Sequence, residues 1–441
     1  MSTDRRTLVV VLVALAVAAP AAALRAMCVG RACRQAGPVR PAVPFCSLPA
    51  GVRALISAGF YDGRGPHVML ITGDTAVRGS TGGGESTAPW PSATDDTSEV
   101  VPLVFAGAGA RSRARVAPGT KLDAVAPTVA EAIGLRRPHP GVRSGEPIAG
   151  VAEPGGRPRL VLEVVWVGVG TADLRGDPTA WPTLRGLIED HAGTLDAAVG
   201  SLPLDPAAVL TTVGTGALPE DHGITGTVVR NDEGRVVPAW GPGSPYSVVA
   251  ALGDDLDELR DQRPRIGAVL TDPAERGVIG GTWYVDGDRD DLRVAAHPPA
   301  QVRVVERLLA DGYGRDRTTD LLAVVMRGSI RSMDRALARM IASAEDAVGE
   351  DVLVVVTATG SAAGSGAAAS TVEAELDRRI GMDVVEAAVP GGLFLDQGAV
   401  ASSGVSEDRV IAQLRRIRSP DGGLLFADAF PSVAVTFARF C

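Results

Sequence analysis

Carboxylates in loop segments are the side chains of this sequence best suited to chemistry. Asp74, Glu85, Asp173 and Asp205 could transfer protons, or they could bind a hard cation such as Mg²⁺ or Ca²⁺, which prefers oxygen ligands. Solvated loop carboxylates are the simpler interpretation of the same four residues. The predicted strands and helices around these carboxylates help to distinguish a chemical role from simple solvation.

The strand that would be expected to carry chemistry ends without any such group. VVVTATGSAAG, residues 354–364, is a buried apolar run followed by a glycine-rich turn. Ligands of open α/β sheets bind at the carboxyl ends of the strands, yet this end offers only threonine, glycine, serine and alanine. The turn matches the TGxxxGxG pattern of short-chain dehydrogenases. That fold needs a tyrosine downstream, whereas all four tyrosines precede the turn.

The histidines also do not form a recognisable ligand set. His222 belongs to an HGI turn, and the other four occupy a strand start, a linker, a helix end and a loop: His67, His139, His191 and His297. We interpret all five as surface or structural residues. The sequence has neither a G-x-S-x-G elbow nor a P-loop, so it gives no support to an esterase or a nucleoside triphosphatase.

The composition and the N-terminal residues indicate a large protein that is exported. The 441 residues are 46% hydrophobic, and the net charge of −9 comes from interspersed residues, which argues against a nucleic-acid partner. Residues 1–26 have the positive start, apolar run and small-residue site of a secretory signal peptide. We therefore expect a secreted protein, or one on the extracytoplasmic face of the cell envelope. The alternative is an uncleaved N-terminal anchor, which would then be the attachment to the membrane.

Four cysteines in an exported chain predict two disulfides. Cys28 and Cys33 are near enough in sequence to pair locally, which leaves Cys46 with Cys441. A cysteine metal site would need nearby histidines or a CxxC pair, and the sequence has neither.

Hydrophobic periodicity predicts alternating strands and helices, and hence a three-layer α/β/α sandwich with a mostly parallel central sheet. The strands are expected in HVMLITG, VPLVFAGAG, RLVLEVVWVGVG, VLVVVTATG and SVAVTFARF, and the helices in residues 48–60, 123–135, 181–193, 299–311, 331–348 and 406–417. Residues 79–96 are rich in glycine, serine, threonine and proline, and they are expected to form a loop.

Three segments together carry a resemblance to a known family. TGALPEDHGITG, residues 215–226, resembles the TGxxPxxHGI segment of type I phosphodiesterase/nucleotide pyrophosphatases in the alkaline phosphatase superfamily. VPLVFAGAG and LDAVAPTVAEAIGL are similar to that superfamily's VPLIFxGPG and DIAPTIAxLLGL, and VLVVVTATG occupies the place of its VVVTADHG. The resemblance implies an alkaline-phosphatase-like sandwich.

The order of the segments implies a circular permutation. In the family the VPLIF and DIAPT segments come last, whereas here they precede the strand that should open the domain. After a linker at 27–45, we expect a single domain over 46–441. Within it, residues 46–136 correspond to the family's C-terminal part, 137–158 form a connecting linker, and 159–441 correspond to its N-terminal part. The old connection would place Cys441 beside Cys46, which agrees with the expected disulfide.

The metal-site positions implied by the resemblance are occupied by unsuitable residues. The family holds two metal ions, usually zinc, with Asp and His ligands, and uses a Thr or Ser nucleophile. Val167 stands where the first strand has a ligand Asp, and Thr359-Gly360 stand in place of Asp-His. Glu85 aligns loosely with a late ligand histidine, and Asp205 falls at the nucleophile position. The DxxxH segment corresponds to AVVMRGSIRSMD, which has no histidine. The implied ligands are therefore lost, and we predict no metal cofactor.

The sequence predicts a catalytically degenerate protein with a binding or structural role in the envelope, whose partner is a small molecule or an envelope component. The alternative is a metal-dependent phosphoric ester hydrolase of phosphodiesterase or phosphatase type with a rebuilt site. A third class, a sugar- or polymer-binding module, would show exposed aromatic residues around a groove, for which Trp90, Trp240 and Trp283 are the candidates. Core packing is the simpler interpretation of these tryptophans.

Overall fold

The computed structural model describes residues 45–72, 78–81, 84–89, 99–153, 155–281, 283–284, 289–362, 369–418, 424–438 and 441; of these, residues 78–89 and 369–370 are described by their backbone alone. Cys28, Cys33, Asp74 and Trp90 lie outside these ranges, as does the expected signal peptide. Among the helices described, none is long and apolar enough to cross a bilayer.

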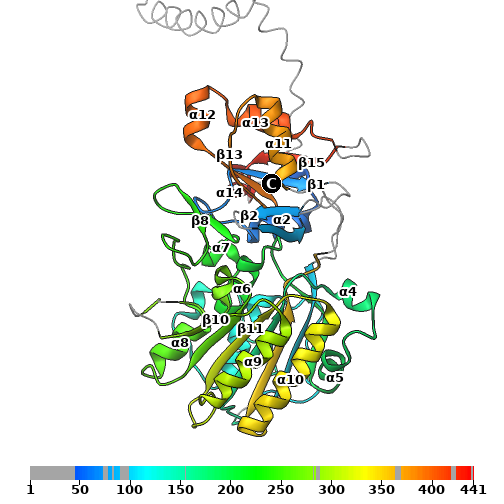
Figure 1. Cartoon of the computed structure of the whole chain (residues 1–441), viewed down its shortest axis with the longest axis vertical. Coiled ribbons are helices and arrows are strands. Elements are labelled where there is room, and N and C mark those ends of the chain that lie inside the picture. The colour runs from blue at the N-terminus through cyan, green and yellow to red at the C-terminus, as the bar shows by residue number, and fades with distance from the viewer. Residues whose placement is uncertain are drawn as a thin grey trace, which may run out of the picture. The chain divides into compact units, whose positions relative to one another are not determined.

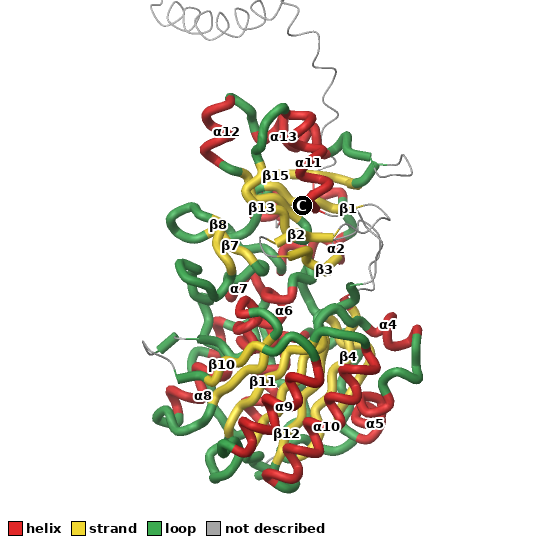
Figure 2. The backbone as a smooth tube through the Cα atoms, in the orientation of Figure 1, coloured by secondary structure: helices red, strands yellow, loops and turns green. Residues whose placement is uncertain are grey.

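A seven-stranded mixed sheet forms the centre of the fold (Figures 1 and 2). Its spatial order is β10 (Asp291–Val294), β9 (Ile266–Leu270), β11 (Asp320–Met326), β5 (Leu160–Trp166), β12 (Val352–Ala358), β4 (Val100–Gly107) and β6 (Ala192–Ala198). The first five strands are parallel, whereas β4 runs antiparallel to both of its neighbours. Four of the central strands, β9, β11, β5 and β12, are buried along their whole length, as expected for strands covered on both faces.

Helices cover this sheet and complete the α/β fold that the periodicity predicts. One packed group is α5 (Pro182–Asp190), α9 (Pro298–Ala310) and α10 (Ile330–Val348), which is seen in front of the sheet in Figure 1. Another is α3 (Val125–Ala132), α6 (Pro206–Thr215) and α8 (Leu252–Leu259). Both groups bury their apolar side chains in one continuous core.

A second, four-stranded antiparallel sheet was not anticipated. Its order is β13 (Val385–Val389), β14 (Gly392–Leu395), β1 (Val68–Thr72) and β15 (Phe426–Pro431). Together with α11 (Ala369–Ile380) and α13 (Glu407–Leu414) it encloses a separate apolar cluster (Figure 1). The early strand β1 therefore lies between two strands from the end of the chain.

Two expectations from the sequence are wrong. SVAVTFARF is not a strand: it contains the short helix α14 (Val433–Thr436), and the strand is the preceding FADAFP, which pairs along β1. Part of the expected loop at 79–96 instead forms the hairpin of β2 (Arg78–Thr81) and β3 (Gly84–Pro89). In both cases the position of the strand is set by the segment with which it pairs, and not by the local amino-acid composition.

The remaining short elements connect these layers: α2 (Ala50–Ala58), α4 (Thr171–Gly176), α7 (Pro219–His222), α12 (Gln397–Ser403), the hairpin β7 (Val228–Arg230) with β8 (Val236–Pro238), and the 3₁₀ turns Phe45–Ser47, Leu122–Ala124, Pro140–Val142 and Pro273–Val278.

The two ends of the described chain are joined. The predicted Cys46–Cys441 disulfide is present, with the two Cα atoms 5.0 Å apart. Beside it, the rings of Phe45 and Phe430 lie 5.4 Å apart. The start of the described chain is thus bonded covalently to Cys441 and packed against the last strand, β15.

The segment that follows α3 is fixed to the core by two arginines. Arg137 Nε lies 2.6 Å from Asp255 Oδ2, and Arg143 Nη2 lies 3.0 Å from the same oxygen. Both guanidinium groups also donate to the Ala250 carbonyl oxygen. Asp255 is fully buried, so its charge is stabilised mainly by these two cations and a tyrosine hydroxyl.

Candidate functional site

The carboxyl ends of β5, β11 and β12 meet at one edge of the central sheet, where the resemblance implies the metal site. Val167 N–H donates to the Met326 carbonyl oxygen at 2.9 Å, and Thr359 N–H donates to the Trp166 carbonyl oxygen at 3.0 Å. The Thr359 hydroxyl accepts a hydrogen bond from Gly168 N–H at 3.0 Å. The structure therefore places Val167 and Thr359 at the same edge of the sheet, but their hydrogen bonds go to the backbone of the adjacent strands and loop, at Met326, Trp166 and Gly168.

The loops after β5 and β12 are also in direct contact. A Cβ atom on Gly170 would come within 2.9 Å of the Ser361 nitrogen, and one on Gly168 within 3.1 Å of the Ala362 side chain. Gly360 has a φ of +98°, a backbone conformation that a histidine rarely adopts. The glycines thus allow the two loops to close, and the conformation of Gly360 disfavours the Asp-His pair of the family.

Asp205 is held at the N-terminus of α6 and has a structural role there. Its Oδ1 accepts hydrogen bonds from Ala207 N–H at 3.0 Å and from the Thr227 hydroxyl at 2.8 Å. The first of these bonds caps the helix, a task for which aspartate is among the preferred residues. The side chain is 1% exposed, so this position is closed to bulk solvent.

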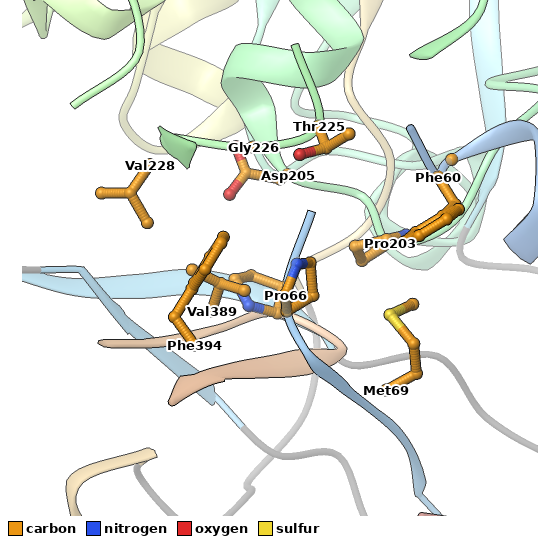
Figure 3. A pocket seen from close by; sticks show the side chains of 12 residues that line it. Phe60, Pro66, Met69, Pro203, Asp205, Thr225, Gly226, Val228, Val389 and Phe394 are labelled. Carbon is orange, nitrogen blue, oxygen red and sulfur yellow. The ribbon is translucent and has the colours of Figure 1, made fainter. Parts of the chain in front are cut away.

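The second oxygen of Asp205 borders a very small cavity (Figure 3). Among the described residues, Oδ2 is buried and has no hydrogen-bond partner. The cavity has a volume of about 10 Å³ and is walled mainly by apolar side chains, among them Phe60, Pro66, Met69 and Phe394. Such a volume admits about one water molecule, whereas ligand pockets typically span roughly 300–1,000 Å³.

The surroundings of Asp205 shift the pKa of its carboxyl group upward. Burial raises its pKa, and the hydrogen bonds from Thr227 and Ala207 and the nearby Arg327 oppose this shift only in part. A protonated carboxylic acid is a poor metal ligand and a poor nucleophile. Because the side chain is buried, an ester in solution cannot reach Asp205.

Arg327 is the charged group nearest to the end of β11. Its Nε donates to the Thr271 hydroxyl at 2.9 Å, and its Nη2 lies 2.8 Å from Glu275 Oε1. Glu275 is itself buried and accepts hydrogen bonds from the backbone of Thr271 and Asp272. This network connects the ends of β9 and β11, and sequence reasoning missed it because both partners lie in ordinary loop segments.

The other carboxylates singled out in the sequence do not join Asp205. Asp173 Oδ2 accepts a hydrogen bond from Gly170 N–H at 2.8 Å and so caps α4. The side chain of Glu85 lies outside the described residues, although its backbone belongs to β3. Within the AVVMRGSIRSMD segment, Asp334 is buried and accepts from the backbone N–H groups of Thr183 and Leu184.

Two histidines act structurally, of which His222 is buried and His67 is half-buried. His222 Nδ1 accepts from Ile224 N–H at 3.1 Å, and its Nε2 lies 3.1 Å from the Thr212 hydroxyl, so its expected structural role is confirmed. Burial lowers its pKa to about 3. His67 Nδ1 accepts from Leu395 N–H at 2.9 Å, and burial lowers its pKa to about 4. In the part of the chain that the structure describes, no three His, Cys, Asp or Glu side chains are grouped as metal ligands would be.

A buried glutamate in the middle of β5 was also missed. Glu163 is 2% exposed, and its Oε1 has no partner among the described residues. Burial raises its pKa to about 8. The signal was present in the sequence, because a single charge interrupts the apolar run LVLEVVW.

Comparisons with known proteins find similarity to solved structures but none at the level of sequence. No protein-family model matches the chain, and no curated protein matches it in sequence. Among solved structures, wild-type alkaline phosphatase PafA superposes with a TM-score of 0.44 at 15% identity, over 59% of this chain and 76% of that chain. A multiply substituted PafA variant gives a TM-score of 0.44 at 14% identity, over 60% and 77%.

Proposed function

We propose that this chain is a catalytically degenerate, circularly permuted relative of the phosphodiesterases in the alkaline phosphatase superfamily, with a binding or structural role outside the cytoplasm. The observation that carries the proposal is the closed end of the central sheet. Val167 and Thr359 are engaged in the hydrogen bonds that close β5 against β11 and β12. Gly360 has a left-handed conformation, and Asp205 is a buried helix cap. These four positions thus serve packing.

The electrostatics of this region support the same proposal. Two cations placed a few ångströms apart require several ionised ligands. Asp205 is held in an apolar cavity that raises its pKa, and Arg327 already supplies a positive charge close by. Glu275 is already bonded to this guanidinium and to backbone N–H groups, so its carboxylate is not free to bind a metal ion. We therefore propose that no zinc pair binds here.

The test is metal content and hydrolysis together. Purified full-length protein is analysed for zinc by mass spectrometry and assayed on an aryl phosphodiester and an aryl phosphate. We expect substoichiometric zinc and no turnover above the uncatalysed rate. Zinc near two ions per chain, lost on chelation together with activity, would overturn the proposal.

The alternative, a hydrolase with a rebuilt site, centres on Asp205 as proton donor. If the wild type hydrolyses either ester, the Asp205→Asn variant tests this alternative. It keeps an oxygen that can accept the hydrogen bonds at the start of α6, and it removes the carboxylic acid. A strong loss of turnover in a folded variant would support the rebuilt site. Unchanged turnover would exclude Asp205 as its acid.

The circular permutation is supported by the joined ends of the chain. Cys46 and Cys441 are bonded, and β1 lies between β14 and β15 although it comes from the start of the chain. If the chain is permuted, a variant in the family's order should also fold. In this variant a peptide linker joins residue 441 to residue 46, and the new termini lie near Gly155. We expect such a protein to unfold cooperatively within a few degrees of the wild type. Failure of this variant to fold, while the uncut linked chain folds, would contradict the proposal.

Export is supported by the disulfide between the chain ends, because such bonds persist in oxidising compartments. Fractionation of the native host with an antibody against the chain would test the location. Recovery of the intact protein in the cytoplasmic fraction, with Cys46 and Cys441 reduced, would contradict it.

A further inference from the structure

An open groove lies beside the HGI turn, and its lining residues are not those of the loops that close the end of the central sheet. It has a volume of about 450 Å³, within the range typical of ligand sites, and its walls come from four loops. The lining includes Arg64, Asp232, Tyr246, Val248 and Trp283. Val248 N–H donates to the His222 carbonyl oxygen at 2.9 Å, so one wall is attached directly to the HGI turn.

Aromatic and apolar side chains are concentrated in this groove. Tyr246 is 63% exposed, Val248 41% and Trp283 40%. These are three of the ten large hydrophobic residues that are exposed in the described part of the chain. Such residues cost solubility when they gather on one surface, and their concentration at a concave site is typical of a binding surface.

Trp240, by contrast, has a packing role. Its ring is partly buried against the cluster formed by Ala207, Ile224, Ala239 and Ala274. Of the two candidate tryptophans that the structure describes, Trp240 is therefore a packing residue and Trp283 lines the groove.

The loops of the groove are held in place by polar contacts to the backbone. The Asn231 side chain accepts from Glu233 and Arg235 N–H groups and donates to the Gly243 carbonyl oxygen at 3.0 Å. Arg64 Nη1 donates to the carbonyl oxygen of Tyr246 at 2.7 Å. These bonds fix the backbone on either side of the opening, so the groove is preformed.

The Trp283 wall is anchored to the N-terminus of α8. Asp254 accepts hydrogen bonds from the backbone of Gly281, at 3.0 Å, and of Trp283. The adjacent Asp255 accepts from the Tyr284 hydroxyl at 2.8 Å. Two neighbouring carboxylates therefore hold two neighbouring aromatic residues, and the backbone of Trp283 is fixed while its ring remains partly in solvent.

Two charged side chains, Asp232 and Arg64, line the groove next to these rings. Asp232 is exposed and makes no ion pair or hydrogen bond among the described residues. The Arg64 guanidinium, whose charge faces carbonyl oxygens and the Tyr61 ring, also borders the groove. A carboxylate and a guanidinium are planar groups that can each bond two adjacent hydroxyls, whereas the rings offer flat apolar faces.

We propose that this groove binds a neutral oligosaccharide chain. A pyranose ring has an apolar C–H face, which would pack on Trp283 and Tyr246, and a hydroxyl edge, which would bond to Asp232 and Arg64. A strongly charged ligand is disfavoured because the groove carries charges of both signs. The inference concerns a different surface from the closed sheet end, so it stands whether or not that end is catalytic.

The experiment titrates the full-length protein with chitotetraose, cellotetraose and maltotetraose, followed by calorimetry and by tryptophan fluorescence. We expect saturable binding of at least one of these chains. Trp283→Ala should weaken that binding at least tenfold, Tyr246→Ala by a smaller factor, and Asp232→Asn about threefold. Trp283→Phe, which keeps an aromatic face, should recover part of the affinity.

Phe437→Ala is the matched control, because Phe437 is an aromatic residue of similar exposure that does not line the groove. It should leave affinity unchanged, and all variants should show the wild-type melting temperature within a few degrees. The proposal is overturned if none of the three oligosaccharides binds, or if binding is insensitive to Trp283→Ala and Tyr246→Ala. Binding of a proline-rich peptide in place of any oligosaccharide, with the same sensitivity, would also overturn it.

Discussion

At the carboxyl end of β5 and β12 the two loops are closed on each other by backbone hydrogen bonds, whereas the loops beside the HGI turn leave Tyr246 and Trp283 in solvent. The first region has the location expected of an active site but is packed like a core. The second is preformed and open although no catalytic motif pointed to it. Position in a fold therefore indicates where a site can form, and only side-chain packing decides whether one has formed.

The largest expected effect concerns the closed region and comes from Glu163, in the strand that ends there. Its folded-state pKa of about 8 lies above the ordinary value of 4.5. The folded state therefore retains a proton that the unfolded state releases, and stability is lost as the pH rises from about 4.5 to about 8. Glu163→Gln should remove this loss and raise the free energy of unfolding by about 3–5 kcal/mol at pH 9.

Chemical denaturation of both proteins at pH 4 and pH 9 measures this difference. At pH 4 the two should be nearly equal, because the carboxyl group is then protonated in both the folded and the unfolded state. A pH-independent difference between wild type and variant would contradict a buried ionisable Glu163.

Closure of the sheet end can be tested with a single methyl group. Gly170→Ala places a Cβ within 2.9 Å of the Ser361 nitrogen and 3.2 Å from the Val100 carbonyl oxygen. We expect a loss of about 2–3 kcal/mol in the free energy of unfolding, because overpacking forces the loops apart. Gly176→Ala is the control, since its Cβ would meet no atom within 4 Å. Equal stability of the two variants would mean that the loops are not tightly closed.

Asp205 should behave as a cap and not as a catalytic acid. Asp205→Ala removes the acceptor for Ala207 N–H and the Thr227 hydroxyl, and should cost about 1–2 kcal/mol. Asp205→Asn keeps that acceptor, so it should cost less than about 1 kcal/mol. Thermal melts of both variants at pH 7 provide the measurement. An Asn variant as unstable as the Ala variant would show that the carboxyl group does more than cap α6.

The smallest effect is expected at the groove. Trp283→Ala and Tyr246→Ala remove exposed rings, so each should change the free energy of unfolding by no more than about 0.5 kcal/mol. Denaturant titration of the unliganded proteins checks this. A decrease of about 2 kcal/mol or more in the free energy of unfolding would show that these rings are packing residues. The groove would then not differ from the closed sheet end in this respect.

Much of the fold was predictable because it depends on local pattern. The sequence pattern of a segment indicates whether it forms a strand or a helix, independently of its partners. This holds for the apolar runs of β5 and β12 and for the amphipathic periodicity of α9 and α10. The four-stranded sheet was not predictable, because β1 and β15 pair across most of the chain. The strand predicted in SVAVTFARF was wrong for the same reason, because its structure depends on a distant partner. Pairing with β1 ends at Pro431, and a helix begins at Val433.

The sequence by itself determined that the positions of Val167, Thr359 and Gly360 carry no metal-binding side chains, and that Cys46 and Cys441 could meet. Only the tertiary structure decided what those positions do. Closure of the sheet end depends on contacts between loops about 190 residues apart, as in the bond between Gly168 and Thr359. Exposure of Trp283 and burial of Trp240 likewise depend on which distant segments cover each ring, a property that residue type does not encode.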